Sequence, residues 1–195
     1  MRLQQKSLCF DDVLLYPQQS DINSRSEVDL STRIGNVHLR LPIIAAPMDT
    51  ICEPKMAIEM ARNNGLGILH RFANLDIDIA NWVEVCNKAD VPTFISIGVN
   101  SPENTVFKIK ELLKHNRIDG SCIDVAHGHH SKVFNLIRAL RENLGDGFNI
   151  IAGSIATPDA ASFLKTAGAN IFRIGVGGGS ICSTRIQTGH GIPTL

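Results

Sequence analysis

The sequence has no surplus of charge of either sign. Over 195 residues, 19 Lys and Arg balance 19 Asp and Glu, which gives a formal net charge of +0. This balance gives no reason to expect nucleic acid or an anionic membrane as a partner. No apolar run approaches the ~20 residues of a membrane span, and the N-terminal residues lack the long apolar stretch of a signal peptide. We therefore expect a cytoplasmic protein that binds neither nucleic acid nor membrane.

The sequence also lacks cysteines that are closely spaced in pairs. The five cysteines are odd in number and widely scattered, at Cys9, Cys52, Cys86, Cys122 and Cys182. This pattern is neither a disulfide framework nor a CxxC metal site, so we expect reduced thiols, most of them in the core. No linker, internal repeat or low-complexity segment occurs, and 44% of the residues are hydrophobic. Residues 1–195 are therefore expected to form a single domain.

From residue 41 onward, short apolar strands alternate with helices. Strands are predicted at residues 41–46, 66–70, 93–99, 120–125, 148–152 and 170–176. Helices are predicted at residues 54–63, 77–87, 131–144 and 158–166, and from residue 102 after the cap Ser101. Continuously apolar strands, each followed by a helix, indicate a parallel sheet that is buried on both faces. Before residue 41, residues 24–30 alternate as a half-buried strand would.

Two architectures contain this alternation of strands and helices, a doubly wound sheet and a (β/α)₈ barrel. Nearly every predicted strand runs into a polar or glycine-bearing loop, at residues 48–50, 70–71, 98–100, 124–130, 153–154 and 175–184. A barrel gathers all such loops on one face, whereas a doubly wound sheet gathers only those at its switch point. We therefore favour the (β/α)₈ TIM barrel. About six of its eight βα units fit this length, because a complete barrel typically takes roughly 250 residues.

The stretch from Arg173 to Arg185 carries the strongest chemical signal. An apolar strand runs into a glycine loop and then into Cys182, which has hydroxyl residues on either side. Glycines let backbone amides approach a phosphate or a monovalent cation, and inward-facing amides would lower the pKa of the thiol. Cys182 is thus the leading nucleophile candidate, and Thr184 could relay a proton. The alternatives are a tight turn beside a buried thiol, and a threonine that only caps a helix.

Two other loops hold polar side chains after strands. Residues 124–130 contain Asp124 and three histidines, but their spacing is too compressed for a zinc site. Asp124 is either a ligand contact or a cap, and His70-Arg71 either meets an anion or is a solvated loop. From the residues alone, the chain is a nucleotide- or phosphate-binding α/β enzyme that uses a cysteine.

Six segments of the chain are together similar to the IMP dehydrogenase / GMP reductase family. In chain order they are residues 10–15, 28–32, 47–50, 123–128, 151–153 and 175–185. Each segment alone is weak evidence, but six in register are highly specific. The resemblance covers almost the whole chain and implies a (β/α)₈ barrel, usually tetrameric, with chemistry at C2 of a purine nucleotide.

The resemblance also implies roles for individual residues. Cys182 would attack C2 to form a covalent purine intermediate, hydride would pass between that carbon and a nicotinamide, and Thr184 would transfer a proton. Potassium would bind at Gly177, Gly179, Cys182 and Arg185, mainly through carbonyl oxygens. Substrate contacts would come from Met48, Ser154 and Ser180, and cofactor contacts from Ser24, Arg25, Arg71, Asp124, Val125 and Ala126.

Within the family, the chain is closest to the GMP reductase branch. No pair of CBS modules interrupts it, and Ser24-Arg25 resembles the reductase pair that reaches the cofactor of a neighbouring subunit. Arg71 stands where reductases place a basic residue for the NADP phosphate. The implied reaction is the NADPH-dependent reductive deamination of GMP to IMP and ammonia. The alternative is an IMP dehydrogenase without CBS modules, which would convert IMP to XMP with NAD, because residues 46–48 read as in the dehydrogenase.

Two departures from the family pattern matter. Ser154 stands where the family has asparagine, and the shorter side chain cannot make the same hydrogen bonds. The family's seventh and eighth strands and its catalytic flap have no counterpart, so relative to the family the chain is C-terminally truncated. We expect the functional protein to be longer, a homotetramer, or paired with a complementary C-terminal chain. A second alternative is a non-catalytic remnant that retains part of a nucleotide site.

Overall fold

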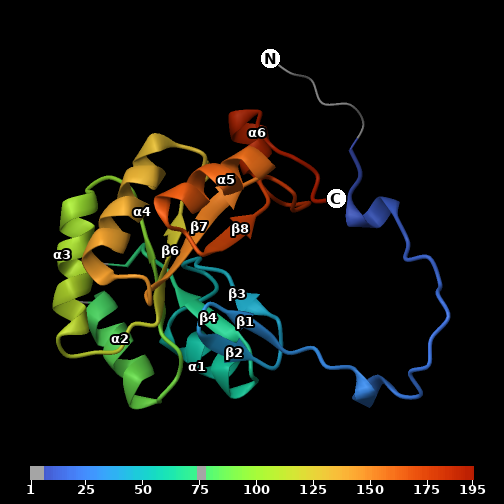
Figure 1. The fold of residues 1–195 in the computed structure, drawn as a ribbon, viewed down its shortest axis with the longest axis horizontal. Helices are drawn as coiled ribbons and strands as arrows, with labels where there is room; N and C mark the ends of the chain where they lie inside the picture. Colours follow the sequence, from blue (N-terminus) through green and yellow to red (C-terminus); the bar gives the residue numbers. More distant parts are fainter. Residues whose placement is uncertain (1–6, 74–77) are drawn as a thin grey trace.

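Six parallel strands form a curved sheet whose strand order follows the sequence. The computed structural model describes residues 7–73 and 78–195. The strands are β3 (Ile44–Ala45), β4 (Leu66–Leu69), β5 (Phe94–Ile97), β6 (Gly120–Asp124), β7 (Asn149–Ile155) and β8 (Ile171–Ile174). The helices are α1 (Pro54–Arg62), α2 (Asp78–Lys88), α3 (Pro102–Leu113), α4 (Ser131–Leu144), α5 (Pro158–Ala167) and α6 (Thr184–Thr188). Sequential parallel pairing is the order of a barrel, and Figure 1 shows an α/β half-barrel that is open on one side.

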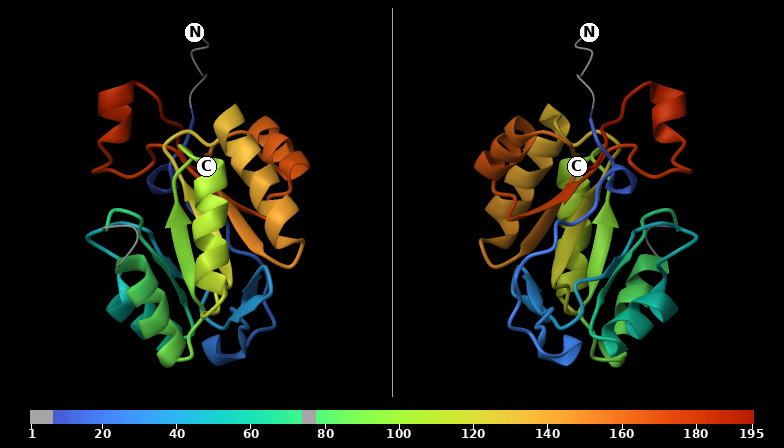
Figure 2. Two further views of the ribbon diagram at one scale, coloured as in Figure 1. Left: turned by 90° about the vertical axis from the view of Figure 1, so that its left-hand side faces the viewer. Right: turned by 90° about the vertical axis from the view of Figure 1, so that its right-hand side faces the viewer.

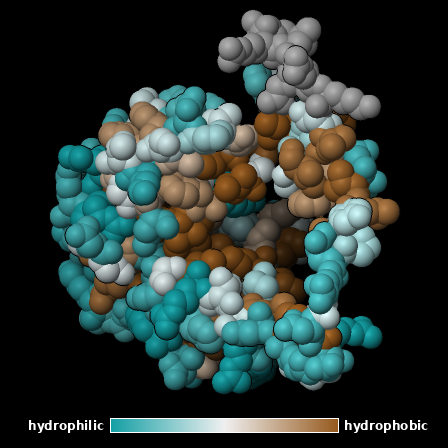
Figure 3. Space-filling view, turned by 45° about the vertical axis from the view of Figure 1, so that its right-hand side comes forward, coloured by the Kyte–Doolittle hydropathy of each residue, from teal (hydrophilic) through white to brown (hydrophobic). Residues whose placement is uncertain are grey.

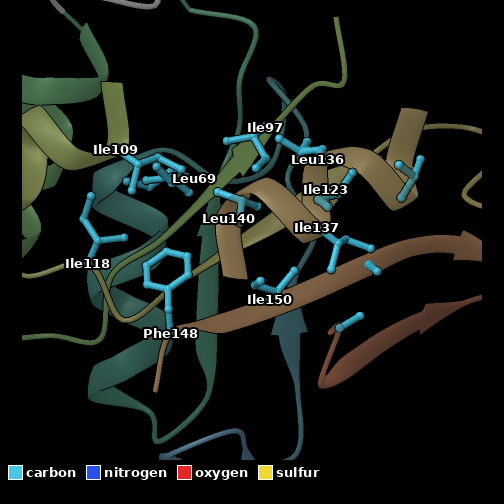
Figure 4. Close-up of a cluster of buried hydrophobic side chains, with 14 of the residues drawn as sticks. Leu69, Ile97, Ile109, Ile118, Ile123, Leu136, Ile137, Leu140, Phe148 and Ile150 are labelled. Carbon is cyan, nitrogen blue, oxygen red and sulfur yellow. The ribbon is translucent and has the colours of Figure 1, made fainter. Parts of the chain in front are cut away.

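The outer face of the sheet holds the main core. Successive side chains of a strand point to opposite faces, so Ile97, Ile123 and Ile150 all face the helices. There they pack with Leu136 and Leu140 of α4, and Figure 4 shows these side chains meeting between the helix and the strands. All five side chains are buried, so the helical layer covers this part of the outer face.

The inner face holds a second, smaller core at the amino-terminal ends of the strands. Here Leu66, Phe94, Cys122 and Ile151 pack together with Leu39. Leu39 belongs to an antiparallel hairpin formed by β1 (Thr32–Ile34) and β2 (Val37–Leu39), which plugs the bottom of the half-barrel. The hairpin therefore covers apolar side chains at one end of the inner face, as the helices cover those of the outer face.

One asparagine attaches this hairpin to the sheet. The side-chain amide of Asn149, the first residue of β7, donates to Asn36 Oδ1 at 2.5 Å and to the Asp119 carbonyl at 2.6 Å. Asn36 lies in the turn between β1 and β2, next to Gly35, whose φ of +60° suits glycine. Asn149 itself is buried, at 2% exposure, and both bonds are partly buried.

The rest of the inner face is open. A cavity of about 260 Å³ is lined by Ile44 and Ile68 on one side and by Ile151 and Ile171 on the other. The cavity thus receives side chains from both edge strands, β3 and β8. Figure 3 shows it as a hollow with hydrophobic walls.

Residues 7–31, here called the N-terminal arm, run outside this opening. The arm contains two 3₁₀ turns, Phe10–Asp12 and Arg25–Glu27, and otherwise lacks regular structure. Figure 1 shows it as a wide loop that stands away from the half-barrel and returns to it at β1. Leu14 and Leu15 of the arm are each 98% exposed.

The alternation of strands and helices is as predicted. Helix α4 spans residues 131–144 as expected, and α5 begins at a threonine cap, where the Thr157 hydroxyl accepts from the Ala160 amide at 3.2 Å. Gly168 ends α5 with a left-handed φ of 109°. Ser101 occupies the N-cap position of α3, but its side chain makes no capping bond. The first residue of the predicted helix 77–87 lies outside the described residues. No helix in the described ranges is long and apolar enough to cross a membrane.

Two local predictions are wrong. Residues 24–30 form no strand, because they lie in the exposed arm where no strand is available to pair with them. Residues 153–154 are not a loop after a strand, because β7 continues to Ile155. The first error reflects the lack of a pairing strand beside the arm, and the second reflects pairing of β7 with strands that are distant in the sequence.

Replacing Asn149 with alanine should loosen the hairpin. The substitution leaves the Asp119 carbonyl and the Asn36 side chain without their partner, which we expect to cost about 1–3 kcal/mol in the free energy of unfolding. Urea unfolding measures this loss. Asn143→Ala, which removes an exposed hydrogen bond to Lys110, is the control and should change stability by less than about 0.5 kcal/mol. Equal effects of the two substitutions would contradict the anchoring role.

Candidate active site

The predicted site residues come mostly from one edge of the sheet. In a parallel sheet, the carboxyl ends of all strands meet at the same edge, so the loops that follow them are neighbours. Met48 follows β3, Arg71 follows β4, and Asp124 ends β6. The glycine loop, residues 175–183, follows β8. Met48 is 47% exposed, so its side chain is accessible to a ligand at this edge.

Backbone hydrogen bonds join the segment after β6 to β7. The Ser154 amide donates to the Val125 carbonyl at 2.8 Å, and the Val125 amide donates to the Gly153 carbonyl at 3.3 Å. The Gly128 amide then donates to the Ser154 carbonyl at 2.7 Å. The structure therefore places Ser154, a predicted substrate contact, beside Val125 and Ala126, two predicted cofactor contacts.

Asp124 has a partner that the sequence analysis missed. Its carboxylate forms an ion pair and hydrogen bond with the guanidinium of Arg173 in β8, two strands away. Gly153, in the intervening strand β7, has no side chain, and an added Cβ would lie only 2.6 Å from Arg173 Cβ. A single arginine within the apolar strand Ile-Phe-Arg-Ile was the available signal, since a charge at such a position needs a partner.

The glycine loop is held closed at its base. Val176 and Ile192 form an antiparallel bridge, in which the Ile192 amide donates to the Val176 carbonyl at 2.9 Å. Gly177 has a φ of +68°, which favours glycine, and a Cβ there would lie in tight contact with Arg185 Cβ at 3.2 Å. The predicted potassium residues Gly177 and Arg185 are therefore neighbours.

Two carbonyls inside the loop already have donors. The Cys182 amide donates to the Gly179 carbonyl at 3.1 Å, and the Arg185 guanidinium donates to the Ser180 carbonyl at 3.1 Å. These bonds hold Cys182 at the far turn of the loop, one residue before the cap of α6. The Cys182 side chain is partly exposed, so a ligand can reach the sulfur.

The thiol of Cys182 differs from the buried thiols. The Thr184 hydroxyl, by hydrogen bonding to the sulfur, lowers the pKa of Cys182, and the Thr184 backbone amide adds to this effect. Burial instead raises the pKa of Cys52 and Cys86 to about 11 and that of Cys122 to about 12. Cys182 is thus the more readily ionised thiol, although its main stabilising partner is a hydroxyl group rather than the glycine amides that we expected.

The His70-Arg71 pair divides into a structural residue and an accessible cation. His70 is 3% exposed, and its Nδ1 accepts from the Phe72 amide at 3.1 Å. The Arg71 guanidinium lies over the Phe72 ring, 4.7 Å from its centroid, at the edge of a cavity of about 210 Å³ between β5 and α3. Arg71 Nε is buried and has no hydrogen-bond partner among the described residues.

The structure does not bring every predicted residue to this edge. Ser24 and Arg25 lie in the arm, where the Ser24 hydroxyl accepts from the Ser26 amide at 3.3 Å. Figures 1 and 2 place their turn at the end of the molecule opposite α6. His130 has a local role, because its ring Nδ1 accepts from the Lys132 amide at 3.0 Å and caps α4.

The sequence of this chain is similar to those of known enzymes. A family model described as the IMP dehydrogenase / GMP reductase domain matches residues 7–195. The GMP reductase of Bacillus subtilis is 36% identical over 184 residues, which are 93% of this chain and 55% of that protein. The GMP reductase of Oceanobacillus iheyensis is 38% identical over 184 residues, 93% of this chain and 54% of that protein.

A solved structure also resembles the half-barrel. The crystal structure of inosine 5′-monophosphate dehydrogenase from Legionella pneumophila matches with a TM-score of 0.85 and 39% identity. The match covers 96% of this chain and 56% of that one. The chain therefore spans about half the length of the relatives that it matches.

Alkylation should distinguish Cys182 from the buried thiols. Because its pKa is lowered, Cys182 should react with iodoacetamide at a lower pH than an ordinary thiol. Cys52, Cys86 and Cys122 should react later, because burial raises their pKa values and shields their sulfurs. Mass spectrometry of peptides from samples quenched across a pH series gives the midpoint for each cysteine.

The same measurement tests the cause of the shift. Thr184→Val removes the hydroxyl and should move the midpoint of Cys182 to higher pH, whereas Ser183→Ala should leave it unchanged. An unchanged midpoint in Thr184→Val would contradict the proposed hydrogen bond.

Gly153→Ala should disturb the pairing of Arg173 with Asp124. The new Cβ would meet Arg173 Cβ at 2.6 Å and the Arg173 carbonyl at 2.8 Å, so β7 and β8 must separate. We expect a loss of about 1–3 kcal/mol in urea unfolding. Gly147→Ala, where an added Cβ meets nothing within 4 Å, should be neutral or slightly stabilising. Equal stability of the two variants would show that β8 can move away from β7 without a loss in the free energy of unfolding.

Proposed function

The chain belongs to the IMP dehydrogenase / GMP reductase family, and from this premise we propose that it carries the nucleophile of a GMP reductase. The proposed reaction is the NADPH-dependent reductive deamination of GMP to IMP and ammonia. The observation that carries the proposal is Cys182, a partly exposed thiol of lowered pKa in a glycine loop at the carboxyl edge of the sheet. The curated relatives quoted above support this branch, since both are GMP reductases.

In the proposed mechanism, the Cys182 thiolate bonds to C2 of the purine. The exocyclic amino group leaves C2 as ammonia, and the S–C2 bond breaks after hydride has reached that carbon, which releases IMP. The Thr184 hydroxyl, already a partner of the sulfur, is positioned to move a proton to the departing amine. Met48, Ser154 and Ser180 hold the base and phosphate in the proposal.

The cofactor side uses residues after β4 and β6. NADPH, when bound, supplies the hydride. Arg71 offers a positive charge at the edge of a cavity, which fits the phosphate of a nucleotide. Asp124, fixed by Arg173, lines the nicotinamide side together with Val125 and Ala126. The turn that holds Ser24 and Arg25 lies at the end of the molecule opposite α6 (Figures 1 and 2), so the proposal assigns these residues to the cofactor site of a neighbouring subunit in a tetramer.

The glycine loop also suits a potassium ion by its donor chemistry. The backbone carbonyls of Gly177, Gly179 and Cys182 are hard oxygen ligands, and a carbonyl has two lone pairs. The Gly179 carbonyl can therefore accept from the Cys182 amide and still face a cation. In the proposal, Arg185 closes the loop and the ion holds it in shape.

A second candidate function is that of an IMP dehydrogenase, which oxidises IMP to XMP with NAD. The favouring observation is the Legionella pneumophila structure, since its 39% identity is as high as that of the reductases. The same thiol would attack the same carbon. The two candidates differ in the nucleotide and in the direction of hydride transfer.

A purine nucleotide with a leaving group at C2 tests the nucleophile. With 2-chloro-IMP, an S–C2 bond should form at Cys182 while the C2–Cl bond breaks and chloride leaves, which intact mass detects as an adduct. Cys182→Ala should lose the adduct, and Cys9→Ala, which changes another partly exposed thiol, should keep it. An adduct that survives in Cys182→Ala would sink the assignment.

Turnover separates the two candidates. The protein is supplied either with GMP and NADPH or with IMP and NAD⁺, and nicotinamide absorbance is followed. We expect NADPH oxidation with GMP. Turnover only with IMP and NAD⁺ would replace the reductase assignment by the dehydrogenase.

A further inference from the structure

A buried histidine directly precedes the arginine that the proposed function places at the cofactor. His70 follows the last residue of β4 and is 3% exposed. Its backbone amide donates to the Cys52 carbonyl at 3.3 Å. Its ring meets the Trp82 ring of α2 edge to face, with 4.8 Å between the ring centroids. The backbone and the ring of His70 are therefore both held in place.

The hydrogen bond of the imidazole defines its tautomer. His70 Nδ1 accepts from the Phe72 amide at 3.1 Å, so Nδ1 carries no proton and the ring carries its proton on Nε2. Nε2 lies 3.6 Å from Glu53 Oε1 and has no hydrogen-bond partner within the described part of the chain. The ring therefore uses its acceptor for the Phe72 amide and turns its donor towards a carboxylate.

Phe72 connects this imidazole to Arg71. The Phe72 ring is stacked with the His70 ring, with 25° between their planes and 6.2 Å between their centroids. The Arg71 guanidinium lies over the Phe72 ring, 4.7 Å from its centroid. A cation over an aromatic face is attracted by the negative charge density of that face. The position of Phe72 therefore also sets the position of the guanidinium.

Gly98, which directly follows β5, bounds the guanidinium on another side. A Cβ added to this glycine would lie 3.4 Å from Arg71 Nη1 and 3.6 Å from Arg71 Cζ, so the guanidinium passes close to the Gly98 backbone. Arg71 and Gly98 both line the cavity of about 210 Å³ between β5 and α3. The positive charge at this cavity is thus held between an aromatic ring and a glycine.

We propose that His70 is a positioning residue for Arg71. Through its bond to the Phe72 amide, the imidazole holds the Phe72 ring against the guanidinium and keeps the positive charge at the cavity before a ligand arrives. A side chain that is already held in its bound geometry loses less conformational entropy on binding. The inference rests on the proposed function, in which Arg71 meets the phosphate that distinguishes NADPH from NADH. It adds a residue that touches neither the cofactor nor the substrate.

Binding of NADP⁺ and NAD⁺ tests the inference without turnover, because only NADP⁺ carries the additional 2′-phosphate. Isothermal titration calorimetry gives the dissociation constants, and their ratio is the preference for NADP⁺. His70→Ala removes the acceptor of the Phe72 amide and should lower this preference about two- to tenfold, with the affinity for NAD⁺ unchanged. A histidine that only fills the core would weaken both ligands equally, and that result would overturn the proposal.

His70→Asn is the conservative variant for this test. Its side-chain oxygen can take the place of Nδ1 and accept from the Phe72 amide, so the preference for NADP⁺ should return to within about twofold of the parent. His70→Gln carries its amide one carbon farther from the backbone, near the place of Nε2, and should not restore the preference. Equal preferences of the Asn and Gln variants would contradict the role of the Nδ1 acceptor.

Phe72 provides a second test that leaves the core intact, since this residue is 57% exposed. Phe72→Leu removes the ring and should lower the preference for NADP⁺ about two- to fivefold, the range of a cation–π contact at an exposed site. Phe72→Tyr keeps a ring and is the matched control. Equal preferences of these two variants would overturn the link through the ring. Urea unfolding, followed by the fluorescence of Trp82, the single tryptophan, checks that every variant folds.

Arg71→Ala separates this inference from the proposed function. If Arg71→Ala lowers the preference for NADP⁺ and His70→Ala does not, Arg71 binds the phosphate without help from His70, and only this inference fails. If Arg71→Ala leaves the preference unchanged, the cofactor role of Arg71 fails and the positioning role fails with it. The assignment of Cys182 is tested by its own adduct and does not depend on either result.

Discussion

A parallel sheet must bury both of its faces, and the rest of this structure depends on how that requirement is met. The helices cover the outer face, where Ile97, Ile123 and Ile150 are buried against α4 and its neighbours. The inner face is covered only at its amino-terminal end, by the hairpin that Asn149 attaches. The remaining inner surface is apolar and open. The outer face of the sheet is therefore covered, whereas much of its inner face is exposed.

The same sheet determines where chemistry can take place. Loops at its carboxyl edge are held by the strands beneath them, so Ser154, Val125 and Asp124 owe their positions to pairing between β6 and β7. Arg173 reaches Asp124 only because Gly153 leaves room above the intervening strand. The glycine loop has its own closure at Val176 and Ile192, which fixes the turn that presents Cys182. A rigid base and short loops give the candidate site its shape.

Much of this arrangement could be predicted from the sequence, because its causes are local. Threonine at the start of α5, glycine at its end and continuous apolar runs for strands are signals within a few residues of their effect. The errors have distant causes. The pairing of Asp124 with Arg173 spans 49 positions, and the exposed turn at residues 25–27 follows from the absence of a neighbouring strand. Cys182 could be identified from the glycine loop that precedes it in the sequence. The role of the Thr184 hydroxyl, which lowers its pKa, became clear only from the folded loop.

The strand order has a further consequence, for the time course of folding. Every strand from β3 to β8 pairs with the next strand in the sequence, so each pairing closes a loop of only about one βα unit. Each of these pairings has a lower loop-closure cost than a pairing between strands distant in the sequence, which favours stepwise growth of the sheet. No step among these strands has to wait for contact between β8 and β3. The half-barrel can therefore assemble through successive pairings of neighbouring strands.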